Sequence, residues 1–131
     1  MNKLTEISLI IPSKNAESKL TQLLESISGW EKIPNEIIII DSSQEKYKIS
    51  SNFERFVKES GIRLILIHKQ NLYPGHARNI GINSSTNTLL AFLDTSTQPN
   101  SRWLSSGINL IDLNKSDGVW GSTYYQATKF S

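Results

Sequence analysis

The sequence predicts an α/β fold, a three-layer α/β/α sandwich in which helices cover both faces of a mostly parallel sheet. Short, apolar, β-branched runs alternate along the chain with segments whose apolar residues recur at helical spacing. The run 37–40 is four consecutive isoleucines, as expected for a strand that is covered on both faces. Repeated strand–helix–strand units with short connections favour parallel strands with helices on either side.

The expected elements follow from these patterns in order. Strands are predicted at residues 7–11, 37–40, 62–67 and 88–93, with the start of a fifth at 119–120. Helices are predicted around residues 20–27, 53–57, 75–84 and 104–111. The first strand should end at Pro12, which cannot donate to a ladder, and Gly29 and Gly61 should close the first two helices. The polar segment 42–51 has few apolar residues and is expected to be the most loosely held loop.

The composition is that of one ordinary globular domain spanning residues 1–131. Hydrophobic residues make up 37% of the chain and charged residues 20%, and the net charge is +2 with no basic run. This charge argues against a nucleic-acid-binding or anionic-membrane surface. The absence of cysteine excludes disulfides and thiolate metal sites. No segment resembles a signal peptide or a membrane span, so we expect a cytoplasmic protein.

Polar residues follow three of the predicted strands. The first strand leads into residues 12–15, the second into 41–43 and the fourth into 94–96. In open parallel sheets, ligands bind beyond the carboxyl ends of the strands, where the strand order reverses. Asp41 and Asp94 each have the alternative of capping the turn that follows, as aspartate commonly does. Because both acids follow wholly apolar strands, we favour a binding site.

Four segments carry a family resemblance. They are residues 7–15 (ISLIIPSKN), 36–43 (EIIIIDSS), 71–82 (NLYPGHARNIGI) and 90–104 (LAFLDTSTQPNSRWL). In this order and spacing the chain resembles the inverting family 2 glycosyltransferases, which have the GT-A fold of nucleotide-diphospho-sugar transferases. The resemblance implies that the chain binds a nucleoside diphosphate sugar, with a UDP-sugar favoured, and transfers its glycosyl group to an acceptor.

The resemblance implies a nucleotide-sugar site made of Pro12, Ser13, Asn15, Asp41, Ser43, Gly75, Arg78 and Asp94. Pro12 and Asn15 match the loop that lies against the base and ribose in this family. Asp41 matches the carboxylate that accepts a hydrogen bond from the base, which suits a pyrimidine imide donor. Arg78 matches an arginine near the nucleotide, and Gly75 lies in the turn into a helix whose first amides favour an anion.

Asp94 matches the first acid of the family's DxD metal motif. There a divalent cation, Mn²⁺ or Mg²⁺, bridges the carboxylate and the diphosphate. In this chain the last acid of the motif is replaced by Ser96, and Thr97 follows it. A neutral hydroxyl is a poorer ligand for a hard cation than a carboxylate is, so we expect weakened metal binding through Asp94.

The chain printed here ends at Ser131, before the region that supplies the acceptor site and the general base in this family. We therefore expect a truncated domain that is incomplete as an enzyme, and we assign it no catalytic residue. Asp112 and Asp117 are interpreted as solvated turn acids. An uncovered sheet edge is expected to pair with a second copy of the chain, giving a homodimer through residues 119–125.

Other conspicuous residues are expected to be mostly structural. His68 and the packing tryptophans Trp30, Trp103 and Trp120 belong to this group, as do Asn79 and Gly81. His76 is interpreted as a turn residue bordering the nucleotide, and Tyr73 as a wall of the pocket.

Two alternatives to an enzyme domain remain open. The neutral residues Ser42, Ser43, Ser96 and Thr97 stand where acids are expected, which also fits a non-catalytic nucleotide-binding or protein-assembly module on the same scaffold. A doubly wound domain of receiver or flavodoxin type shares the alternating pattern, although no suitable acid cluster with a placed lysine and no flavin loop is visible.

Overall fold

A parallel sheet forms the centre of the protein. The computed structural model describes residues 3–114, and the strands within that range pair in the order β3-β2-β1-β4 with every pairing parallel. Their bounds are β1 Lys3–Ser13, β2 Lys32–Asp41, β3 Arg63–His68 and β4 Leu90–Phe92. The four strands predicted within residues 3–114 are present, but the first two extend beyond their apolar runs and the fourth is shorter than predicted.

Pro12 lies inside β1, so the prediction that it ends this strand is wrong. Even-numbered residues of β1 bond toward β4, since Ser8 N–H donates to Leu89 and Leu93 N–H donates to the Ile10 carbonyl. The β1–β4 register ends at Phe92, opposite Ile10. The backbone N of Pro12 faces the β4 side, as that of Ile10 does, but lies beyond the end of the β1–β4 pairing. Its missing N–H therefore removes no ladder bond, and β1 continues beside β2.

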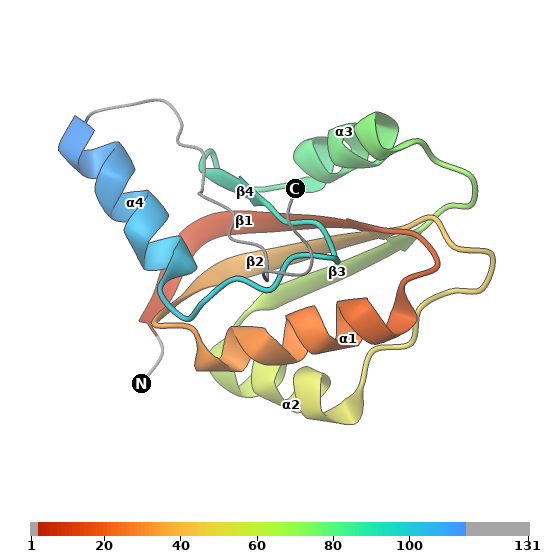
Figure 1. Cartoon of the computed structure of the whole chain (residues 1–131), viewed down its shortest axis with the longest axis horizontal. Helices are drawn as coiled ribbons and strands as arrows, with labels where there is room; N and C mark the ends of the chain where they lie inside the picture. The colour runs from red at the N-terminus through yellow and green to blue at the C-terminus, as the bar shows by residue number, and fades with distance from the viewer. Residues whose placement is uncertain (1–2, 115–131) are drawn as a thin grey trace, which may run out of the picture.

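The helices form the two outer layers, which confirms the predicted sandwich (Figure 1). The helices are α1 Glu17–Ser26, followed by the 3₁₀ turn η1 Ile27–Gly29, α2 Ser51–Ser60, α3 Pro74–Ser84 and α4 Trp103–Asn114. Helices α1 and α2 cover one face of the sheet, and α3 covers the other (Figure 1). Within the described residues, no helix is long and apolar enough to cross a membrane.

The order in which successive strands are placed in the sheet reverses at β1. The chain first builds outward from β1 through β2 to β3, and then crosses the opposite face through α3 to place β4 on the other side of β1. Strands β1 and β4 therefore meet at the point where the strand order reverses, which is where open α/β sheets bind ligands.

Two apolar cores lie on either side of the sheet. The larger one joins Leu9 and Ile11 of β1 to the buried leucines of α1, to Phe53 of α2 and to Leu104 of α4. The smaller one joins Ile10 to Ile38 and Ile40 of β2 and to Ala77 of α3. Alternate residues of β1 thus enter opposite cores, as predicted for strands covered on both faces.

Gly81 allows α3 to lie close against β1. A Cβ atom added at this glycine would overlap the Cγ2 atom of Ile10, which is fully buried. The sequence-based prediction that Gly81 serves packing is therefore confirmed.

The ends of α2 follow the predicted signals. Ser50 accepts a hydrogen bond from Phe53 N–H at 3.2 Å, and Gly61 ends the helix with a φ of 80°. The first helix instead ends at Ser26, and the 3₁₀ turn η1 carries the chain to Gly29.

The segment 42–51 is anchored, so the expectation of a loosely held loop is wrong. Tyr47 is buried and its hydroxyl is 2.6 Å from that of Thr21, while Ile49 packs against the larger core. The prediction rested on the small number of apolar residues in this segment, but Tyr47 and Ile49 are sufficient to anchor it. Asp112 also differs from expectation, because it lies within α4 rather than in a turn. The predicted fifth strand, Asp117, Trp120 and the dimer edge at 119–125 lie outside the described residues.

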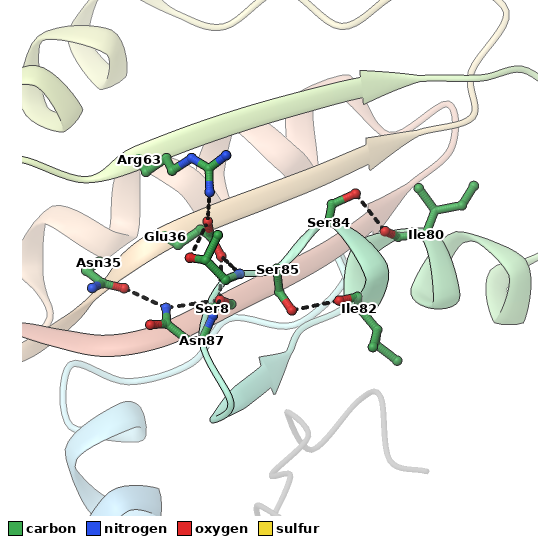
Figure 2. A network of polar contacts seen from close by, with 10 residues as sticks. Ser8, Asn35, Glu36, Arg63, Ile80, Ile82, Ser84, Ser85 and Asn87 are labelled. Carbon is green, nitrogen blue, oxygen red and sulfur yellow. Dashed lines mark hydrogen bonds and ion pairs between the residues drawn. The ribbon is translucent and has the colours of Figure 1, made fainter.

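A buried carboxylate holds the connection between α3 and β4 (Figure 2). Glu36 of β2 is 1% exposed and accepts hydrogen bonds from Ser8 at 2.5 Å, Arg63 at 2.7 Å and the Thr86 amide at 2.8 Å. Asn87 donates to the Ser8 hydroxyl at 3.0 Å. Burial alone would raise the pKa of Glu36, but the bonds from Ser8 and Thr86 and the charge of Arg63 outweigh it and lower the pKa.

We predict that Gly81→Ala destabilises the fold. The added methyl group overlaps Ile10, and overpacking of this kind costs about 1–3 kcal/mol, partly offset by the better helix propensity of alanine. Urea unfolding of both proteins measures the difference. Gly75→Ala in the same helix is the control, because a Cβ there meets no atom within 4 Å. Equal stability of the two variants would contradict the close approach.

We also predict that Glu36→Gln destabilises the fold in a pH-dependent way. At neutral pH the loss is about 2 kcal/mol, because a neutral amide replaces a carboxylate that accepts several bonds. A carboxyl whose folded pKa is lowered contributes its stability above its ordinary value of 4.5 and loses it as the pH falls below that value. The difference between wild type and variant should therefore shrink in urea titrations below pH 4.5. Glu59→Gln on the exposed face of α2 should show no such trend.

Candidate functional site

Two adjoining pockets lie at the carboxyl ends of β1, β2 and β4. The first, of about 500 Å³, is enclosed by the loop after β1 and the segment after β2, and its lining includes Ser13, Asp41, Ser43 and Tyr47. The second, of about 600 Å³, lies between the β1–α1 connection and the turn after β4, and its lining includes Lys14, Lys19, Thr95 and Ser96. Asn15 and Glu17 line both pockets, so the two pockets adjoin.

Asp41 shapes the wall of the first pocket. It ends β2, is 0% exposed, and its carboxylate accepts hydrogen bonds from the Ser43 amide at 3.1 Å and from the Tyr47 amide at 2.6 Å. The bond to Ser43 forms the aspartate turn that the sequence offers as the alternative role of Asp41. Each oxygen thus already serves a backbone donor, and this fixes the course of the segment after β2.

Further bonds hold the same segment against β3. His68 Nε2 is 2.8 Å from the Ser43 carbonyl, and Gln70 donates its amide to the Gln44 carbonyl at 2.8 Å. The structural role predicted for His68 is therefore confirmed. Tyr47 closes the segment on the side of α1. Burial raises the pKa of this tyrosine, a rise that the Thr21 bond opposes and the nearby charges of Glu17 and Glu25 reinforce.

Asn15 connects the two loops of the site. Its φ of 50° lies in the left-handed region, which asparagine tolerates better than most residues. In this conformation its amide donates to the Ser43 hydroxyl at 2.7 Å. Ser42 donates its own amide to the Ser13 carbonyl at 2.9 Å. The loop after β1 and the segment after β2 are thereby held together.

Asp94 begins an exposed turn after β4. Its Oδ1 accepts a hydrogen bond from the Ser96 amide at 3.1 Å, and its carbonyl accepts one from Thr97 at 3.0 Å. Thr95 is buried, whereas Asp94 and Ser96 are exposed. The turn thus places Ser96 in the lining of the second pocket and Asp94 next to it.

Comparison with known proteins identifies the family. Residues 8–130 match the protein family described as Glycosyl transferase family 2. This chain belongs to glycosyl transferase family 2. Glycosyltransferase AglE of Haloferax volcanii is 31% identical over 123 residues, which cover 91% of this chain and 40% of AglE. The poly(ribitol-phosphate) beta-N-acetylglucosaminyltransferase TarS of Staphylococcus aureus is 22% identical over 114 residues, covering 86% of this chain and 20% of TarS.

Solved structures show the same fold. TarS 1-349 of S. aureus in complex with UDP-GlcNAc superposes with a TM-score of 0.64 at 22% identity, covering 94% of this chain and 38% of that chain. The mannosyltransferase PcManGT from Pyrobaculum calidifontis, in complex with GDP-Man and Mn²⁺, superposes with a TM-score of 0.60 at 16% identity, covering 81% and 32%. The fold of this family 2 domain is therefore GT-A, and the chain spans 40% or less of the length of these relatives.

The predicted site residues fall into two groups in this family 2 domain. Ser13, Asn15, Asp41 and Ser43 come together in the first pocket, and Asp94 stands beside the second. Pro12, Gly75 and Arg78 line neither pocket, and both Gly75 and Arg78 are exposed on α3. Their roles at the nucleotide stay predictions.

The aromatic and histidine candidates are also placed. Trp103 stacks at a tilt on buried Trp30 with their ring centroids 5.7 Å apart, which confirms that both pack in the core. Tyr73 is 81% exposed and lines neither pocket, so the structure does not make it a pocket wall. His76 is exposed on the first turn of α3.

Sequence reasoning missed several residues that line the site. Lys14 and Lys19 lie in the second pocket, and Tyr47 lies in the first. Lys14 stands between the predicted site residues Ser13 and Asn15, so its place in the sequence already indicated that it lies at the site. Tyr47 gave no such signal, because its place depends on Asp41 and Thr21.

The described residues fit a divalent cation poorly. Asp94 is the acid at the metal motif, and one of its oxygens already accepts the Ser96 amide. Across residues 3–114, no group of three or more His, Cys, Asp or Glu side chains is placed to hold a metal ion. Ser96 would add only a neutral hydroxyl, which hard cations bind weakly.

We predict that Asp41→Asn destabilises the domain more than Asp94→Asn does. Asparagine keeps one acceptor oxygen but presents an NH₂ group to the second buried amide, and leaving such a donor unsatisfied costs about 1–3 kcal/mol. At exposed Asp94 water replaces the lost bond, so the change should stay within about 0.5 kcal/mol. Urea unfolding compares the two variants, and hydrogen exchange should show faster exchange of the Tyr47 amide in Asp41→Asn only. A slow Tyr47 amide in that variant would contradict the anchoring role.

Proposed function

We propose that this domain binds a nucleoside diphosphate sugar, with UDP as the favoured nucleotide, and provides the donor site for glycosyl transfer. The observation that carries the proposal is the pair of adjoining pockets at the point where the strand order reverses. A nucleoside diphosphate sugar is an elongated ligand with a flat base at one end and charged phosphates in the middle. Two adjoining polar subsites suit such a ligand.

The first pocket suits the base and ribose. Its lining includes Ser13, Asn15, Ser43 and Tyr47, together with the charged residues Glu17, Glu45, Lys46 and Lys48. Hydroxyl and amide groups both donate and accept, which matches the polar edges of a base and the ribose hydroxyls. Asp41 lies at the wall of this pocket with two bonds already made. A base N–H would have to use a remaining lone pair of its carboxylate.

The second pocket suits the diphosphate. It adjoins the first through Asn15, and it offers the hydroxyls of Thr95 and Ser96 and the ammonium groups of Lys14 and Lys19. Hydroxyls and ammonium groups are all hydrogen-bond donors to phosphate oxygens. The preference for UDP is supported by TarS, whose structure contains UDP-GlcNAc. PcManGT contains GDP-Man instead, so the base needs a direct test.

A second candidate function is a nucleotide-binding or assembly module that does not turn over. It is favoured by the neutral side chains Ser42, Ser43, Ser96 and Thr97 in the two loops where acids were expected. The two candidates differ in one measurement, the steady release of UDP from a UDP-sugar with and without added acceptors. Sustained release of UDP by this chain excludes a module that binds the UDP-sugar without turning it over.

We predict that Asn15→Gly weakens UDP binding. Glycine keeps the left-handed backbone but removes the side-chain amide of a residue that lines both pockets. Loss of about one hydrogen bond should raise the dissociation constant about three- to tenfold in titration calorimetry. Asn71→Gly is the matched control, because Asn71 also has a positive φ, of 61°, and lines neither pocket.

The proposal as a whole is tested by calorimetry of the wild-type chain with UDP-, GDP- and dTDP-sugars, with and without Mn²⁺. UDP-sugars should bind most tightly. If no nucleotide produces heat under any of these conditions, the donor-site proposal fails.

A further inference from the structure

We propose that Lys14 and Lys19, rather than a bound divalent cation, neutralise the diphosphate in the second pocket. The inference rests on the proposed function and concerns how the same site handles charge. It predicts that UDP binds this domain without a divalent metal.

The first observation is the placement of the two lysines. Lys14 directly follows β1, and Lys19 lies in the first turn of α1. Both are exposed and both line the pocket that also contains Thr95 and Ser96. The two cations thus share one pocket with the turn that carries the altered metal motif.

The second observation concerns the ion pairs of the described residues. Those found among residues 3–114 join Arg63 to Glu36 and Arg102 to Glu31. Within that range, no carboxylate lies within ion-pair distance of Lys14 or Lys19. An arriving diphosphate would therefore meet two cations without breaking an ion pair between residues of this range.

The third observation is the poor fit of the acids to a metal. In the motif turn the acid is Asp94, and Ser96 replaces the second acid. Without a cation, Asp94 and the pocket acid Glu17 both repel a diphosphate, so positive charge must come from another source. Lys14 and Lys19 are the cationic side chains in the lining of this pocket.

Solvent exposure limits the size of the effect. Exposed ion pairs typically contribute less than 1 kcal/mol each, so the two lysines together should change the affinity about tenfold. Salt should weaken the contribution, because exposed charges are screened over about 8 Å at physiological ionic strength.

The experiment compares uridine with UDP by titration calorimetry on the full chain, in EDTA and in Mn²⁺. In EDTA, UDP should bind more tightly than uridine. The double variant Lys14→Gln, Lys19→Gln should lose about tenfold in affinity for UDP and nothing for uridine. Lys14→Arg with Lys19→Arg should retain UDP binding, and Lys58→Gln, on α2 and outside both pockets, should leave it unchanged. Glu17→Gln should strengthen UDP binding in EDTA.

The outcomes separate this inference from the proposed function. The lysine inference is overturned if UDP binds more tightly than uridine only when Mn²⁺ is present. It is also overturned if this difference in affinity survives in the double glutamine variant. In both cases the nucleotide site stands. If neither uridine nor UDP binds under any condition, both are overturned.

Discussion

The burial of residues 7–11 of β1 is the constraint on which the rest of the structure depends. Leu9, Ile10 and Ile11 are each 0% exposed, because alternate side chains enter the two cores and both strand edges are paired. The chain reaches the two neighbours of β1 by crossing opposite faces of the sheet, β2 through α1 and β4 through α3. This route places the reversal of strand order at β1, and with it the two adjoining pockets. The close packing of α3 against Ile10 through Gly81 belongs to the same constraint.

Much of the fold could be predicted from the sequence because it depends on local periodicity. The isoleucine run of β2 and the cap and glycine of α2 carry their structure in a few adjacent residues. The errors arose where a contact joins distant residues. Tyr47 anchors its segment through Thr21 and Asp41, and Pro12 is tolerated because of where β4 ends. Neither relation is visible in a window of neighbouring residues.

The candidate site was predictable in part for the same reason. Residues that directly follow strands, such as Asn15 and Asp41, meet at one edge once the strands are parallel. Arg78 lies on α3, which covers the face opposite α1, so its distance from the pockets depends on a crossover that no local pattern describes. Glu36 also carried no signal of its own. Its four hydrogen bonds come from three residues, Ser8 of β1, Arg63 of β3 and Thr86 in the connection after α3, and only the folded sheet brings them to one carboxylate.

Ser42, which stands where an acid was expected, has a bonding role that a carboxylate cannot fill. Ser42 donates its hydroxyl to the Ser13 carbonyl at 3.3 Å, and an ionised acid has no proton to donate. Ser43 accepts the Asn15 amide while its own amide is held by Asp41. The loop after β1 and the segment after β2 are thus joined by neutral groups and by one buried acid. Adding acids there would bring like charges close to Asp41, which disfavours their ionised forms. The same loop after β1 carries Lys14. The serines that stand in place of acids and the lysines therefore lie on connected parts of one site.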